Sequence, residues 1–158
     1  MSSPTPFDQQ AFDQWHKTQQ QELQKYLQSR AVFDGHISGE WLWIIPHRAM
    51  LGRIWLQHDK SRKLWVIAGV VPTDHVPSRA ANTPREAARY FALKWQMEAA
   101  RLGKSAAPQT DDGKVDWKSI SDNIASRAEW LYGLVGDNRR WNADGMPLFR
   151  IDHEAAQA

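Results

Sequence analysis

A strand pattern that runs through a proline-bounded turn into a patterned helix, between Lys63 and Trp95, most constrains the fold of this chain. The run KLWVIAGVV is apolar at nearly every position and ends in the polar turn Pro72–His75. The segment Thr83–Glu86 then has the order of a helix cap, a first-turn proline and a capping-box glutamate. A strand that is apolar on both faces has to be covered on both faces. The stretch therefore predicts an α+β fold with titratable groups where a strand ends and a helix begins.

Two further helices and an antiparallel sheet are predicted around that stretch. Thr5 is a capping residue and Pro6 suits a first turn, so an N-terminal helix is expected to run from there to about Ser29. A last helix is expected over Asp116–Val135, followed by Gly136. Three short segments are predicted to be the strands of a meander, and the first and third are apolar on both faces: Glu40–Ile45, Arg53–His58 and Lys63–Val71.

The sequence also makes predictions about the two loops that link these strands and about the edge of the sheet. The first link, Pro46–Gly52, is long enough to carry function, and the second, Asp59–Arg62, has the length of a hairpin turn. The third strand would be an edge of a plain meander, which is unfavourable for so apolar a run. We therefore expect a fourth strand, supplied by Pro147–Ile151 near the C-terminus.

The helix that begins at Pro84 carries apolar residues on two sides. One stripe consists of Ala88, Phe91, Trp95, Ala99 and Leu102, and the other of Tyr90, Leu93, Met97 and Ala100. A helix that is apolar on two sides is expected to be packed on two sides, here between the sheet and another helix. Gly103 is expected to end it.

The composition indicates a single globular domain. The chain has 158 residues, of which 42% are hydrophobic and 24% charged, and fraying is expected at about residues 1–4 and 153–158. Nine tryptophans make it tryptophan-rich. They belong either to the core or, for two or three of them, to a binding surface, because tryptophan is enriched at interface hot spots.

Charge and cysteine usage exclude several classes of function. The net charge of +2 comes from basic residues spread along the chain, so nucleic-acid binding is not expected. The absence of cysteine excludes disulfides and thiol chemistry. No apolar run approaches the ~20 residues that span a bilayer, and no signal-peptide pattern begins the chain. A cytoplasmic protein without a membrane segment is therefore expected.

The first candidate site joins Asp74 and His75 to Arg85 and Arg89 of the following helix. Asp74 can orient His75 as a general base, since a carboxylate fixes the tautomer of an imidazole. Alternatively, Asp74 bonds local backbone and stops the strand, or pairs with Arg85 or Arg89 and pins the loop to the helix. These readings remain open from the residues alone.

The second candidate is a rim of charged groups at one end of the sheet. In a meander, the first hairpin loop with His47 and Arg48 lies at the end where the third strand exits, so both residues are expected beside Asp74, His75 and Arg79. Such a rim suits a small anionic ligand or an acidic protein surface, or else it is simply solvated.

Other chemistries have no pattern in the sequence. The six histidines are scattered, and none stand at the i, i+4 spacing of a helical metal pair, so no metal site is predicted. Nucleophile, phosphate-loop and dinucleotide motifs are absent, so no catalytic residue and no cofactor is predicted.

Two motifs in this stretch give a resemblance to a known family. The turn PTDHVP at residues 72–77, the run PREAARYF at residues 84–91 and Trp95 resemble a family of small uncharacterised bacterial proteins, a domain of unknown function. His75 stands where the family pattern has tyrosine, and Gly69–Val71 replaces a more acidic approach to the turn. The resemblance covers about residues 65–95. It implies a bacterial cytoplasmic protein and supplies no activity.

These observations leave two main functional hypotheses. The leading one is a non-enzymatic binding protein, similar to an immunity or regulatory protein, that engages a protein partner. The alternative is a small-molecule enzyme or anion-binding protein that uses Asp74, His75 and Arg85. A structural subunit with exposed tryptophan in a homo-oligomer contact is a third reading. The sequence does not predict the oligomeric state.

Overall fold

The structure is a computed structural model that describes residues 6–32, 37–57, 59–106 and 116–158. Its main elements are α1 (Gln9–Ser29), β1 (Ile37–Ile45), β2 (Ala49–Leu56), β3 (Asp59–Gly69), β4 (Asp74–Pro77), α2 (Pro84–Ala106) and α3 (Trp117–Val135). Short 3-10 turns follow at Ser78–Ala80, Asn138–Arg140 and Ala155–Gln157. None of the described helices is long and apolar enough to cross a membrane.

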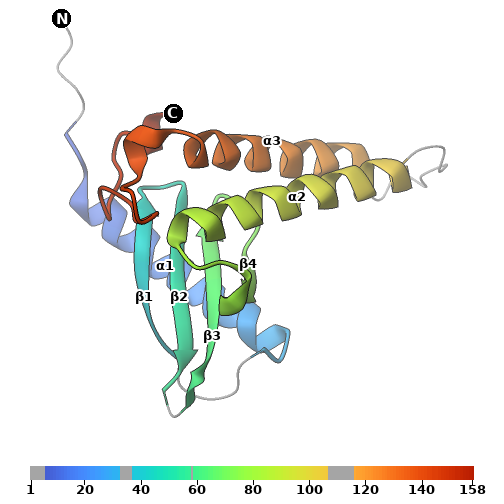
Figure 1. Ribbon diagram of the computed structural model, residues 1–158. Helices are drawn as coiled ribbons and strands as arrows, with labels where there is room; N and C mark the ends of the chain where they lie inside the picture. The colour runs from blue at the N-terminus through green and yellow to red at the C-terminus, as the bar shows by residue number, and fades with distance from the viewer. Residues whose placement is uncertain (1–5, 33–36, 58, 107–115) are drawn as a thin grey trace, which may run out of the picture.

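The strands form one antiparallel sheet in the order β1-β2-β3-β4, with helices on both faces (Figure 1). One face packs on α1 through residues such as Leu27, Ile54 and Val66. The other packs on α2, with α3 lying along α2, around Trp65 and Phe91. The predicted α+β class is confirmed, with its N-terminal helix, antiparallel sheet and two packed helices.

The fourth strand comes from a different segment than predicted. β4 pairs with Leu64–Ile67 of β3, because the chain turns back immediately after Gly69, which adopts φ +130°. The turn predicted at Pro72–His75 is therefore shorter, and its last two residues belong to the sheet. The expected strand Pro147–Ile151 is wrong: Ile151 forms only an isolated bridge beside Ile44 of β1.

Both hairpin links also differ from the sequence-based expectation. The first link is only Pro46–Arg48, since β2 begins at Ala49, and His47 adopts φ 62° in this tight turn. The second link, between β2 and β3, is shorter still, because Asp59 already pairs with Leu56. Asp59–Arg62 is an exposed part of β3 where the register with β2 shifts, and the Asp59 carboxylate accepts a hydrogen bond from the Ser61 amide at 3.1 Å.

Side-chain caps begin the helices. Asp8, rather than Thr5, caps α1 by accepting a hydrogen bond from the Ala11 amide at 3.0 Å; residue 5 lies outside the described residues. Asp116 caps α3 through the Ser119 amide at 3.0 Å. The α2 cap is confirmed: the Thr83 hydroxyl accepts from the Glu86 amide at 3.1 Å.

The two apolar stripes of α2 differ in burial. Every residue of the first stripe is buried, from Ala88 to Leu102. The sheet and α3 both contact this one broad face of α2, so the second stripe is not packed. The expectation that both sides of α2 are covered is therefore wrong. Tyr90 and Leu93 are 43% and 40% exposed, and Met97 is 74% exposed. Gly103 does not end α2, which continues to Ala106.

Four tryptophans lie in the core, and the indole N–H of each of these four has an acceptor. Trp43 donates to the Asp152 carboxylate and Trp95 to the Asp74 carboxylate. Trp65 donates to the Ser78 and Ala81 carbonyls, and Trp141 donates to the Leu134 carbonyl. A buried indole needs such a partner because an unpaired donor is costly in the core. Burial in the core therefore accounts for four of the nine tryptophans. The indole nitrogens of the partly buried Trp15 and Trp130 have no partner among the described residues.

The C-terminal segment packs onto the core. Ala155 is fully buried, and Asp152 accepts hydrogen bonds from Arg140 inside the protein. Fraying of residues 153–158 was expected from the sequence, but this packing holds the segment against β1. The other end for which fraying was expected, residues 1–4, lies outside the described residues.

Candidate functional site

The predicted rim at the end of the sheet is not assembled. His47 packs on the α1 side, with its ring 5.6 Å from that of Trp15. Arg48 turns to the other side, where its guanidinium stacks 4.6 Å from the Trp130 ring and donates to the Ala156 carbonyl at 3.3 Å. Adjacent residues of a tight turn point apart, so the two side chains do not share a surface.

Arg85 and Arg89 lie away from Asp74. The Arg85 guanidinium donates to the Val135 carbonyl at 2.9 Å and to Asn138 at 2.7 Å, so it ties α2 to the end of α3. Arg89 is exposed and lines a shallow groove with Arg85 and Tyr132. Arg85 lies nine residues before Lys94, the α2 residue that meets Asp74, which is roughly 14 Å along the helix.

Asp74 is a buried anchor between β4 and α2. Its Oδ1 accepts from the Lys94 ammonium and from the His75 amide, both at 2.8 Å. Its Oδ2 accepts from the Trp95 indole at 3.2 Å. The carboxylate thus combines the predicted local backbone bond with a long-range pair. That pair is with Lys94, and the suggested pairing with Arg85 or Arg89 is wrong.

His75 meets Tyr26 of α1, a contact that sequence reasoning missed. The Tyr26 hydroxyl lies 2.9 Å from His75 Nδ1 and 3.5 Å from Asp74 Oδ1, so it links the two groups. Burial, aided by the Asp74 charge, raises the pKa of the Tyr26 phenol. Burial lowers the pKa of His75, although the Asp74 carboxylate acts in the opposite direction. Both groups therefore favour their neutral forms at neutral pH.

The depressed pKa of His75 predicts a loss of stability in mild acid. A group whose pKa is lower in the folded protein stabilises the fold above its unfolded value of 6.5, and that contribution disappears as the pH falls through the folded pKa. We expect NMR titration to give a His75 pKa below 6.5, and a His75→Gln variant to lose less stability than the wild type between pH 7 and 5. His16 has a lowered pKa of the same sign, so the comparison between variants isolates His75. An unshifted His75 titration would contradict this prediction.

A groove of basic side chains lies beside His75, where the first half of β3 extends beyond β4. We call it the cationic groove; its volume is about 410 Å³. Arg79 is exposed there and has no ionic or hydrogen-bonding partner among the described residues. The groove is lined by Val32, Ser61, Arg62, Lys63, Leu64, His75, Pro77, Ser78 and Arg79. Among the described residues, no carboxylate is part of this lining, so the groove is suited to a negatively charged group.

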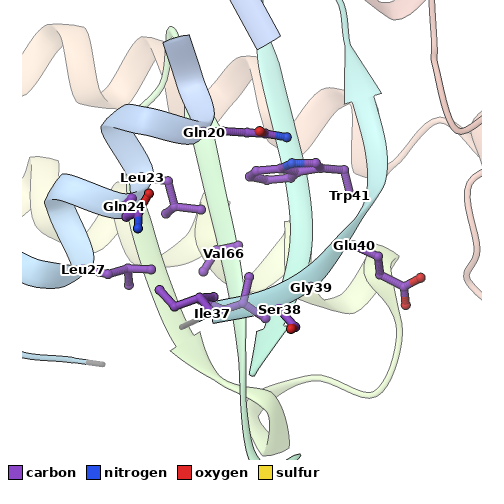
Figure 2. Close-up of a pocket in the computed structure, with 11 residues that line it drawn as sticks. Gln20, Leu23, Gln24, Leu27, Ile37, Ser38, Gly39, Glu40, Trp41 and Val66 are labelled. Carbon is purple, nitrogen blue, oxygen red and sulfur yellow. The ribbon is translucent and has the colours of Figure 1, made fainter. Parts of the chain in front are cut away.

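A second cavity, between α1 and β1, is less suited to a small molecule. Its volume is about 220 Å³, which is below the ~300 Å³ at which ligand pockets usually begin. Leu23, Leu27 and Val66 form an apolar wall, Gln20 lies beside the Trp41 ring, and Glu40 points away from the cavity (Figure 2). It therefore offers apolar surface with little convergent polar chemistry.

In the described part of the chain, no group of three or more acidic or histidine side chains is placed so that it could hold a metal ion. Beside the cationic groove, the polar groups that converge are Asp74, Lys94, His75 and Tyr26.

The chain belongs to the family described as Domain of unknown function (DUF4826), whose model matches residues 8–141. The matched range runs from the α1 cap to Trp141, so the family extends well beyond the 65–95 stretch that carries the resemblance. It includes the Asp74 cluster and the cationic groove. No curated protein and no solved structure matched the chain.

Proposed function

We propose that this protein is a binding protein that engages another protein, and that the cationic groove receives an acidic segment of that partner. The observation that carries the proposal is the exposed Arg79 beside Lys63 and His75, in a groove whose described lining residues include no carboxylate. Complementary charge across an interface accelerates association and selects among partners. An immunity or regulatory role in the bacterial cytoplasm fits such a surface and is part of the proposal.

The shape of the sheet edge favours an extended protein segment over a compact ligand. β4 pairs only with Leu64–Ile67 of β3, so the Asp59–Lys63 part of β3 continues past it. Among the described strands, Asp59 and Lys63 pair only with β2, and the register shifts between these two pairs. An extended peptide can lie along such an edge and present its side chains to the surface beside it. Acidic side chains would then meet Lys63 and Arg79.

The alternative of a small-molecule enzyme built on Asp74, His75 and Arg85 has less support. Asp74 accepts hydrogen bonds from four donors within the protein, and Arg85 is bound to the end of α3. His75 alone reaches the groove, and its ring nitrogen is engaged by Tyr26. A base and an anion clamp that converge on one reacting atom are therefore not seen in the described residues.

Charge reversal in the groove is expected to weaken binding of an acidic peptide. A fluorescein-labelled peptide rich in glutamate should bind the wild-type protein, and fluorescence anisotropy should show roughly tenfold weaker binding to an Arg79→Glu variant at low salt. Lys118→Glu is the matched control, because it makes the same charge change at the exposed start of α3. It should leave binding within about twofold of the wild type.

Two comparisons distinguish an acidic peptide from a small inorganic anion as the ligand of the cationic groove. A peptide with glutamine in place of glutamate should bind poorly, and inorganic phosphate should compete only weakly with the acidic peptide. Equal binding of the two peptides would contradict the proposal. Strong competition by phosphate would instead assign the groove to a small anion.

A further inference from the structure

The outward face of α2 carries an exposed row with the spacing of a coiled-coil seam. The row starts at the acidic Glu86 and ends at the basic Lys104, with apolar residues between them. We call it the α2 row: Glu86, Tyr90, Leu93, Met97, Ala100 and Lys104, all exposed. Successive members are alternately four and three residues apart, which is the a/d heptad spacing.

The row lies opposite the face by which α2 is already packed. Phe91 and Trp95 on that buried face contact the sheet side of the core, and α3 runs along the same helix (Figure 1). At 100° per residue, the row is centred about half a turn away from this face. No described element covers it, and Met97 at its centre is 74% exposed. A contiguous apolar patch of this kind marks an interaction surface.

We propose that the α2 row pairs with the same row of a second copy of this chain, antiparallel and across a two-fold axis. With the axis between Leu93 and Met97, Leu93 of each copy faces Met97 of the other. Tyr90 then faces the small Ala100, and Glu86 faces the oppositely charged Lys104. The row is therefore complementary to itself in shape and charge, as an interface across a two-fold axis requires.

The charges at the ends of the row select the antiparallel orientation. Parallel pairing would place Glu86 against Glu86 and Lys104 against Lys104, which is repulsive. The row spans roughly 27 Å of helix, so one helix from each copy buries a modest area, and the dimer should form in a concentration-dependent manner. The inference is independent of the proposed acidic partner, because the row shares no residue with the cationic groove.

Cysteine cross-linking tests both the contact and its direction. The chain has no cysteine of its own, so a Leu93→Cys chain and a Met97→Cys chain can be mixed and oxidised. The mixed disulfide should form several times faster than either symmetrical one. Faster symmetrical cross-links would overturn the antiparallel arrangement, and a wild-type chain that stays monomeric throughout a concentrated dilution series in sedimentation equilibrium would overturn the dimer.

Charge variants provide the second test by sedimentation. Met97→Glu should abolish dimerisation, while Gln96→Glu, an exposed neighbour outside the row, should leave it unchanged; circular dichroism confirms that both are folded. Lys104→Glu should weaken the dimer roughly tenfold, and the exchanged pair Glu86→Lys with Lys104→Glu should restore it. Glu86→Gln with Lys104→Glu, which removes the Glu86 charge without adding a positive one, is the control for the loss of the Glu86 carboxylate that accepts from the Asn82 amide at 2.8 Å, and it should restore less. A dimer that tolerates Met97→Glu, or a pair exchange that restores nothing, would contradict the proposal.

Discussion

Replacing Arg140 with alanine should lower the free energy of unfolding by about 3–5 kcal/mol, because it leaves a buried carboxylate without its counter-charge. The Arg140 guanidinium donates from Nη1 to both oxygens of Asp152, at 2.9 and 3.2 Å. Arg140 is 8% exposed and Asp152 is 4% exposed. An isolated charge in such a site cannot recover the hydration that it loses on folding.

The effect should extend to the whole C-terminal segment. Asp152 also accepts from the Trp43 indole at 3.3 Å and from the Ala155 amide at 2.9 Å, so it joins β1 to the last turn of the chain. Equilibrium urea unfolding, followed by tryptophan fluorescence and circular dichroism, measures the loss. Without the Arg140–Asp152 ion pair, hydrogen exchange should accelerate at the amides of residues 152–158.

Arg139 provides the matched control for this prediction. It is the neighbouring arginine and also pairs with an aspartate, Asp137, at 3.0 Å, but its side chain is 78% exposed. Exposed pairs are screened by water, so Arg139→Ala should leave the urea unfolding midpoint close to that of the wild type. Similar losses for the two variants would show that burial does not determine the importance of the Arg140 pair.

The elements that the sequence predicts well are those with local causes. The Thr83 cap, the aspartate before α3 and the buried stripe of α2 each depend on residues within a few positions of one another. Periodicity also shows that the other side of α2 is apolar. It does not show whether that side meets another part of the chain, a second molecule or water, because packing partners are not encoded in the period.

The candidate site depends on contacts between distant parts of the chain. Tyr26 and His75 are 49 residues apart, and Lys94 lies 20 residues after Asp74. Tyr26 packs beside Leu23 and Leu27 of α1 against the sheet, so its hydroxyl gave no local signal of a polar partner. The segment that begins at Asp74 is equally compatible with a turn or a strand, and pairing with the apolar edge of β3 determines which one forms.

Substituting Asp74 tests whether the turn-and-helix motif serves mainly the fold. An Asp74→Ala variant should have a free energy of unfolding about 3 kcal/mol lower than that of the wild type. The substitution removes the acceptor of the Trp95 indole, which is buried with a residue exposure of 2%. It also frees the His75 amide and the Lys94 ammonium. Of these donors, the indole is the most costly to leave unpaired, because water does not reach it.

Lys94→Met separates the two roles of the carboxylate. The Lys94 side chain is 45% exposed, so losing its ion pair should cost less than about 1 kcal/mol in urea unfolding, while the indole bond remains. A large loss for Asp74→Ala with a small loss for Lys94→Met would identify the carboxylate as the anchor that holds β4 on α2. If Asp74→Ala were as stable as the wild type, Asp74 would not be needed for folding, and its place beside His75 would then favour a role in binding. The expected result assigns Asp74 to the fold and leaves Arg79, Lys63 and His75 as the residues available to a partner.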